Sequence, residues 1–190
     1  MGTIRILGIA GSLRRGSFNR AALRAAHTLA PIGCTIDDFE LDGIPLFNQD
    51  IEALVPAPVK LFKERIRAAD AILFVTPEYN FSIPGVLKNA IDWASRPYGD
   101  SAWQGKPAAI MGASVALTGT ARAQYHLRQV LVSLDMPVVN TPEVLIANAA
   151  GRFDNDGVLV DEVAKQKIHQ LLSALTALAR LHASEAQPAA

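Results

Sequence analysis

The sequence predicts an α/β protein, a five-stranded parallel sheet with helices on both faces that together form a three-layer sandwich. Two observations support this fold class. Short, nearly continuous apolar runs are typical of strands buried on both faces of a parallel sheet. Between these runs, apolar residues recur every three or four positions, as they do along one side of a helix. Because the two patterns alternate along the chain, right-handed crossovers are expected to make neighbouring strands parallel.

The first half of the chain contains three of the expected strands. Residues 4–10 form an apolar run, and helical spacing follows at Phe18, Ala21, Ala22, Ala25 and Leu29. Pro31 and Gly33 end this helix. The remaining elements of this half are a strand at 34–41, a surface loop with three prolines at 43–58, a helix through 59–69 and a strand at 71–76.

The second half continues the alternation with two more strands. A helix at 85–95 leads to a strand at 107–113. The fifth strand, 138–146, is short and starts irregularly because Pro142 has no N–H for the ladder. The last two helices are marked by apolar stripes at Leu127, Val130, Leu131 and Leu134, and at Ile168, Leu171, Leu172, Leu175, Leu178 and Ala179. The second stripe is too short for a coiled coil, so it predicts core packing.

Composition predicts one cytoplasmic domain, residues 1–182, followed by a frayed tail at 183–190. Half of the 190 residues are hydrophobic, which is enough for a sizeable core, yet no apolar run reaches the roughly 18 residues of a membrane span. The formal net charge is zero, which argues against nucleic-acid and membrane partners. The N-terminus lacks the pattern of a signal peptide. Cys34 is the single cysteine, so no internal disulfide is possible, and an inert buried thiol is expected.

The segment 11–19 (GSLRRGSFN) is the strongest functional signal. It follows the first strand and opens the first helix, where unpaired amides and the helix dipole favour an anion. Two arginines and several hydroxyl and amide side chains lie in the same loop. The layout predicts a phosphate-binding turn, and the alternative is an ordinary strand-to-helix loop with capping residues.

Two common nucleotide motifs are excluded. Gly11 and Gly16 have P-loop spacing, but Ser17 and Phe18 follow, so the required lysine is missing. The G-x-G-x-x-G fingerprint of dinucleotide-binding folds is not present at Gly8 to Gly11 either. The loop therefore suits one terminal phosphate, as on a mononucleotide.

Ligands of open parallel sheets bind at the carboxyl ends of the strands. The loops after the first, third and fourth strands should therefore carry unusual residues. They are 11–19, 76–85 (TPEYNFSIPG) and 112–120 (GASVALTGT). The first suits phosphate and the second offers aromatic and amide groups, so together they predict a site for a phosphorylated planar ligand.

The two longest motifs, 11–19 and 76–93 (TPEYNFSIPGVLKNAIDW), resemble the NADPH-dependent FMN reductase family. Segment 119–128 (GTARAQYHLR) is similar to its chromate, quinone and azo reductase branch. The resemblance covers nearly the whole chain. It implies a flavodoxin-like fold with strand order 2-1-3-4-5, bound FMN, and NAD(P)H as electron donor.

The resemblance also implies which residues bind the cofactor. The phosphate would be held by Ser12, Arg14, Ser17 and Asn19, with helix amides beginning near Phe18. The isoalloxazine ring would be lined, mainly through backbone groups, by Pro77, Glu78, Tyr79 and Asn80, with Ser114 near its pyrimidine end. The third loop departs from the family pattern, because Val115, Ala116 and Leu117 stand where many relatives have glycines.

The same resemblance implies hydride transfer from NAD(P)H to FMN and on to an acceptor in ping-pong kinetics. The cofactor carries this chemistry, so no catalytic side chain is assigned. No metal site is expected, since the four histidines lack paired ligand spacing. Glu78 is expected to be a solvated or interface carboxylate, and Arg15 to face solvent.

Family members are dimers or tetramers, which implies a homodimer or homotetramer here. The apolar helix residues Val86, Leu87, Ile91 and Trp93 suggest a partner surface. A polar contact between dimers is suggested at Arg122, Tyr125 and Glu143.

Three functions remain open at this stage. The first is an FMN-bound reductase of quinones, azo dyes or chromate, with small-molecule acceptors as its partners. The second is a flavin reductase that supplies free reduced FMN to a partner protein. The third is a non-catalytic electron carrier or response domain, against which the balanced charge and the lack of clustered aspartates argue. The physiological acceptor, the choice between NADH and NADPH, and the retention of FMN are not determined by these patterns.

Overall fold

The computed structural model describes residues 2–185 and contains one five-stranded parallel sheet, which confirms the predicted fold class. The strands are β1 (Ile4–Ala10), β2 (Cys34–Phe39), β3 (Ala71–Val75), β4 (Ala108–Ala113) and β5 (Val144–Ile146). Their order across the sheet is β2-β1-β3-β4-β5, and all four pairings are parallel. The order reverses between β1 and β3, which places the topological switch point there.

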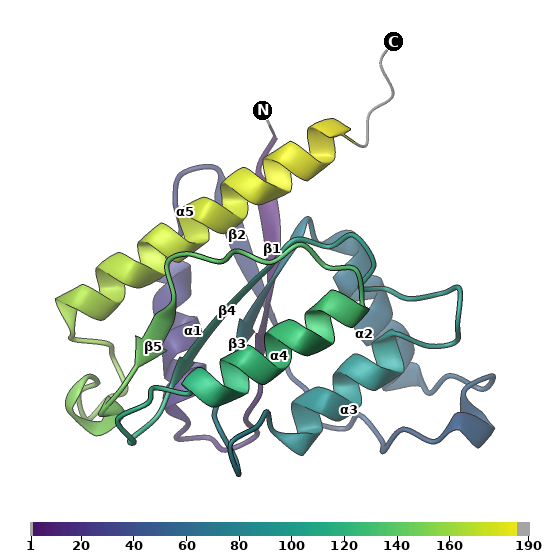
Figure 1. The fold of residues 1–190 in the computed structure, drawn as a ribbon, viewed down its shortest axis with the longest axis horizontal. Coiled ribbons are helices and arrows are strands. Elements are labelled where there is room, and N and C mark those ends of the chain that lie inside the picture. The colour runs from purple at the N-terminus through teal and green to yellow at the C-terminus, as the bar shows by residue number, and fades with distance from the viewer. Residues whose placement is uncertain (1, 186–190) are drawn as a thin grey trace.

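Helices cover both faces of this sheet (Figure 1). They are α1 (Phe18–Thr28), α2 (Ala57–Ala68), α3 (Gly85–Ala94), α4 (Ala121–Ser133) and α5 (Glu162–Glu185), with short 3-10 turns η1 (Gln49–Ile51) and η2 (Ala149–Gly151). Helices α1 and α5 pack on one face, and α2, α3 and α4 pack on the other. The protein is therefore a flavodoxin-like sandwich of three layers.

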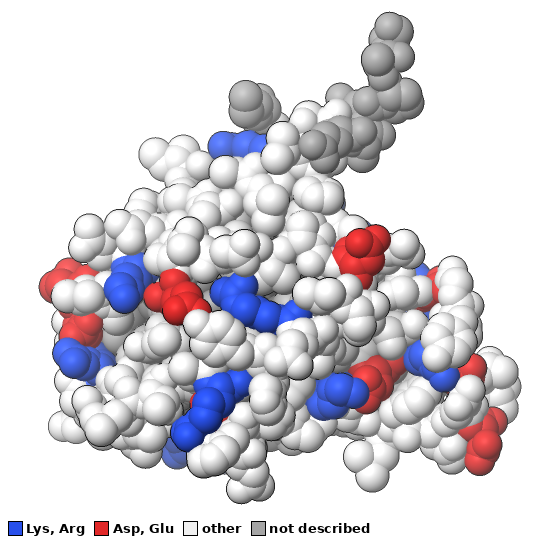
Figure 2. Space-filling model, in the orientation of Figure 1, with Lys and Arg blue, Asp and Glu red and all other residues white. Residues whose placement is uncertain are grey.

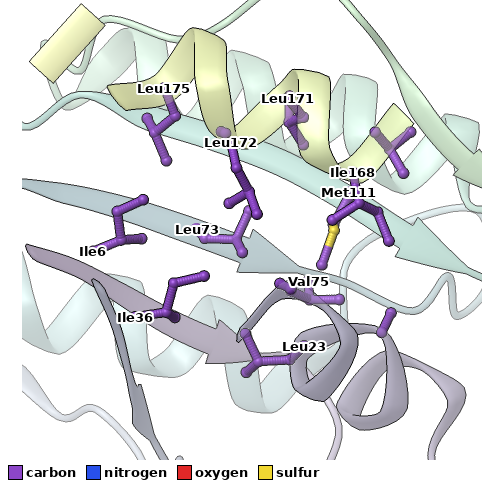
Figure 3. Close-up of a cluster of buried hydrophobic side chains, with 14 of the residues drawn as sticks. Ile6, Leu23, Ile36, Leu73, Val75, Met111, Ile168, Leu171, Leu172 and Leu175 are labelled. Atoms are coloured by element: carbon purple, nitrogen blue, oxygen red, sulfur yellow. The ribbon is translucent and has the colours of Figure 1, made fainter. Parts of the chain in front are cut away.

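Alternating strand residues supply the two halves of the core. Ile6 and Leu73 face the layer of α1 and α5, whereas Leu7 and Ile72 face the opposite layer. Figure 3 shows Leu171, Leu172 and Leu175 of α5 among the side chains of the first half. These three leucines are fully buried, and each such burial stabilises the fold by about 1.5–3 kcal/mol. The leucine stripe of the last helix is core packing, as predicted.

The largest differences from the predicted elements are at the fifth strand and at the C-terminal tail. The fifth strand was expected over 138–146, but β5 contains only Val144–Ile146, and Val138 makes one isolated parallel bridge to Ala108. Pro142 cannot donate to a ladder, so regular pairing begins only beyond it. The tail was expected from residue 183, but α5 continues to Glu185. The rest of the predicted tail, 186–190, lies outside the described residues.

Helix α5 begins with a carboxylate cap. The Asp161 Oδ1 accepts a hydrogen bond of 2.7 Å from the amide of Ala164, which is the third residue of the helix. The other carboxylate oxygen pairs with Arg152. The bond from Ala164 and the nearby Arg152 hold the pKa of Asp161 below its ordinary value. This cap lies beside the end of β5, where Asp161 and Ala164 border a small hollow with Ile146.

Three of the four apolar α3 residues expected at a partner surface are core residues, and the fourth, Val86, is partly buried. Leu87, Ile91 and Trp93 are each at most 1 % exposed. The loop between β2 and α2 covers Trp93, whose Nε1 donates to the Pro45 carbonyl at 2.8 Å and whose ring meets Phe47 edge-on. The helix pattern that suggested a partner is therefore explained by packing within one chain.

The surface carries both signs of charge. On the face drawn in Figure 2, lysines and arginines are interspersed with aspartates and glutamates. Over residues 2–185, the structure contains no helix with the length and apolar character needed to span a membrane. Expectations about nucleic-acid and membrane partners remain predictions.

Candidate functional site

A pocket of about 230 Å³ lies at the carboxyl ends of β1, β3 and β4, beside the switch point. It is lined by Ser12, Arg14, Ser17, Phe18, Asn19, Pro77, Glu78, Tyr79, Ala113, Ser114 and Val115. Of the ten predicted site residues, all except Asn80 are in this set. The three loops chosen from the sequence therefore meet at one place, as the sheet rule requires.

The first loop presents the N-terminus of α1 to the pocket. Ser17 is the N-cap, and its hydroxyl accepts from the amide of Asn19 at 3.2 Å. Ser12 and Ser17 are buried, whereas Arg14 is exposed. Within the described residues, the amides of Leu13 and Phe18 have no hydrogen-bond acceptor, and the first turn of α1 carries no acidic residue. Free amides, the helix dipole and Arg14 make this corner suitable for an anion.

Asn19 holds the first and third loops together. Its Oδ1 accepts from the Ala113 amide at 2.8 Å, and its Nδ2 donates to the Ala113 carbonyl at 2.9 Å. The side chain is buried, so both bonds are shielded from water. Asn19 thus lies in the predicted pocket, but its amide is largely used to fix α1 against the end of β4.

The second loop forms a tight turn. Tyr79 and Ser82 exchange two backbone hydrogen bonds of 2.9 Å, with Asn80 and Phe81 between them. Both central residues have left-handed φ angles, 50° for Asn80 and 64° for Phe81. Asparagine tolerates this region, but an aromatic residue adopts it only under constraint. Asn80 sits at the tip of the turn and does not line the pocket, unlike Pro77, Glu78 and Tyr79.

The environment of Glu78 differs from the one expected. This residue was expected to be a solvated or interface carboxylate. Its side chain is 7 % exposed and paired with Arg122, so it is not solvated. Its Oε1 accepts from Arg122 Nε at 2.6 Å, and its Oε2 accepts from the Arg122 amide at 3.0 Å. No sequence pattern links the two residues, which lie in the loop after β3 and at the start of α4.

The third loop contributes Ala113, Ser114 and Val115. The Ser114 amide donates to the Ile146 carbonyl at 2.9 Å, and its hydroxyl accepts from the Ala116 amide. Val115 lines the pocket although it replaces a glycine of the family pattern, and it is 65 % exposed. Ala113 was missed because nothing marks an alanine at a strand end. Its signal is positional, since it is the last residue of β4.

Other predicted features fall outside the pocket. Arg15 is exposed and does not line it. Tyr125, which was expected in a contact between dimers, has Glu143 of its own chain as a partner, and this carboxylate raises the pKa of the phenol. Cys34 is half-buried, and burial raises the pKa of its thiol. Within residues 2–185, no three His, Cys, Asp or Glu side chains are grouped to hold a metal ion.

A larger hollow of about 550 Å³ lies at the opposite edge of the sheet, beyond the C-terminal ends of α3 and α4. Arg96 in its wall stacks on the Tyr98 ring, with 3.8 Å from the guanidinium carbon to the ring centroid. This edge holds the amino ends of the strands, where open parallel sheets do not place their ligands. The smaller pocket at the carboxyl edge is therefore the better candidate site.

Fold and pocket together define a flavodoxin-like protein with a corner suited to an anion at its switch point. The family model described as NADPH-dependent FMN reductase matches residues 4–151. The chain belongs to this family of oxidoreductases, which confirms the resemblance seen in the sequence.

Individual relatives agree with this assignment. An NAD(P)H-dependent FMN reductase of Pseudomonas aeruginosa is 57 % identical, over 90 % of this chain and 93 % of the relative. A 2-hydroxy-1,4-benzoquinone reductase of Burkholderia sp. is 45 % identical, over 93 % and 97 % of the two chains. The solved structure of FerB, a flavoenzyme NAD(P)H:(acceptor) oxidoreductase from Paracoccus denitrificans, is 35 % identical with a TM-score of 0.87 and covers 95 % of this chain and 99 % of its own.

Replacing Asn19 tests the link between the loops. Asn19→Ala leaves the buried Ala113 N–H and C=O without partners, so we expect a loss of about 2–4 kcal/mol in the free energy of unfolding, measured by urea denaturation. Asn155→Ala, at an exposed position, is the matched control and should change it by less than about 0.5 kcal/mol. Equal stability of the two variants would contradict the role given to Asn19.

Proposed function

We propose that this protein is an FMN-dependent NAD(P)H oxidoreductase that reduces quinones. The observation that carries the proposal is the corner formed by Arg14, Ser12, Ser17 and the N-terminus of α1 in the pocket at the switch point. The relatives named as FMN and quinone reductases support the same activity. The proposal includes the reduction of azo dyes and chromate, because an accessible flavin can pass electrons to many acceptors. It also includes ping-pong kinetics.

The residues of the pocket fit FMN. A terminal phosphate needs several donors and no competing negative charge, and the first loop offers free amides, two hydroxyls and one guanidinium. Glu78 is the one carboxylate in the pocket lining, and Arg122 offsets its charge. The corner is therefore electrostatically prepared for a dianion.

The other side of the pocket suits a flat ring. Pro77, Tyr79 and Val115 present apolar surface, and Tyr79 and Val115 remain more than half exposed at the mouth. A ring held there would keep one face open to a nicotinamide or a quinone. Bound FMN supplies reversible two-electron chemistry, so the protein needs no acid, base or nucleophile for hydride transfer. Its own task is to bind the phosphate, to orient the ring and to leave space for the second reactant.

The proposed assembly is a homodimer or a homotetramer. The proposed location is the cytoplasm. An apolar rim supports association, because Leu13, Phe81 and Leu117 are exposed beside the pocket. The single cysteine is compatible with a reducing compartment. Light scattering after gel filtration should give a multiple of 20.3 kDa at micromolar concentration, and a single 20.3 kDa species would contradict association.

Spectra and turnover test the activity. The purified protein, or the protein after addition of FMN, should show the visible spectrum of bound flavin. It should oxidise NADH or NADPH faster with a benzoquinone than with free FMN as acceptor. Tight retention of FMN and quinone turnover support the proposal. Rapid FMN exchange with faster turnover on free FMN favours a flavin reductase, and a protein that binds no FMN refutes both.

Arg14→Ala tests the phosphate corner. Losing a charged hydrogen bond should weaken FMN binding by about 1.5–3 kcal/mol, about 10- to 150-fold, as measured by quenching of flavin fluorescence. Arg15→Ala removes the same charge one residue away, at a position outside the pocket, and should leave the affinity nearly unchanged. Riboflavin, which lacks the phosphate, should bind far more weakly than FMN. Equal affinities of the two arginine variants for FMN would show that Arg14 does not bind the phosphate.

A further inference from the structure

Helix α4 begins without a cap from its own N-cap residue. Thr120 occupies this position with a left-handed φ of 72° and makes no side-chain capping bond. Its hydroxyl instead accepts from Gln124 Nε2 and lies over Gly112, so close that a Cβ on this glycine would be 2.0 Å from it. The Ala121 amide donates to the Thr118 carbonyl, so the next two amides of α4 need an acceptor from elsewhere in the fold.

Glu78 provides this acceptor. Its Oε2 lies 3.0 Å from the Arg122 amide and 3.3 Å from the Ala123 amide. These are the second and third residues of α4, whose amides an N-cap side chain normally satisfies. The second oxygen, Oε1, accepts from Arg122 Nε at 2.6 Å. Both oxygens are thus used on α4, although Glu78 itself belongs to the pocket wall.

The turn that carries Glu78 has a second attachment to the same helix. The Arg122 guanidinium lies over the Phe81 ring, with its central carbon 3.7 Å from the ring centroid. Phe81 is held at a left-handed φ, a strained conformation for an aromatic residue. The turn therefore depends on contacts from outside itself, and Arg122 joins its carboxylate and its aromatic tip.

We propose that Glu78 is a positioning residue for the flavin. Its carboxylate fixes the turn 77–82 to the start of α4 and thereby holds the backbone of Pro77 and Tyr79 in the orientation that the ring requires. This inference rests on the proposed function, because it assumes that FMN occupies the pocket. Glu78 touches no reacting atom and acts through the turn.

The test compares Glu78→Ala, Glu78→Gln and Asp161→Ala in the full-length chain. Asp161 is the matched control because it also caps a helix and pairs with an arginine, but does not line the pocket. Each protein is stripped of flavin and titrated with FMN. The readouts are the dissociation constant, the visible circular dichroism of the bound flavin, and thermal unfolding before FMN is added.

We expect Glu78→Ala to raise the dissociation constant about tenfold, or about 1.4 kcal/mol, and to change the flavin dichroism. Glu78→Gln should recover much of both, since its amide oxygen can still accept from the two helix amides. Asp161→Ala should lower the thermal stability about as much as Glu78→Ala does, because each variant loses a helix cap. It should keep the wild-type affinity for FMN and the wild-type dichroism.

Two results separate the inference from the proposed function. If the wild type binds FMN and Glu78→Ala binds it with the same affinity and dichroism, the positioning role is wrong and the proposed function stands. If the wild type binds no FMN, both are wrong. Should Glu78→Ala not fold, Glu78→Asp decides. It keeps the negative charge but shortens the side chain by one methylene, which draws the carboxylate away from the two helix amides, so wild-type affinity and dichroism in this variant would overturn the inference.

Discussion

The site depends on the two hydrogen bonds between the Asn19 side chain and the main chain of Ala113. They join the start of α1 to the end of β4, across the strand β3 that lies between β1 and β4 in the sheet. Without this link, the positions of the free amides of α1 and of the loop after β4 would be set only by the packing of separate elements. Because both bonds are buried, water does not compete for them, and the geometry of the corner is well defined.

The electrostatics of the pocket follow from where its one carboxylate is directed. A free glutamate beside the phosphate corner would repel a dianion. Glu78 avoids this because Arg122 and two amides of α4 take up its negative charge. The same contacts cap a helix whose own Thr120 is turned toward β4. The Glu78 side chain thus caps the helix, has its charge offset within the pocket wall and fixes a strained turn.

Much of the fold and of the site could be predicted because the relevant signals are local. Gly11 to Asn19 combine a strand end, small polar residues and a helix start within one stretch, so their place in the pocket follows from the sheet rule. The family resemblance added the flavin and the assignment of Pro77, Tyr79 and Ser114. The errors at Trp93 and Glu78 concern long-range contacts. Trp93 was read as surface because the loop that covers it, around Pro45 and Phe47, has no periodic pattern.

The sequence by itself determined the alternation of strands and helices, the identity of the three loops and the family, since each is encoded in the spacing or order of neighbouring residues. Only the tertiary structure decided which polar groups are free for a ligand. Asn19 and Glu78 carry the residue types of a binding site, yet their side chains are largely bonded to Ala113 and to α4. The physical reason is that a hydrogen-bonding group serves a ligand only where the folded chain has not already satisfied it.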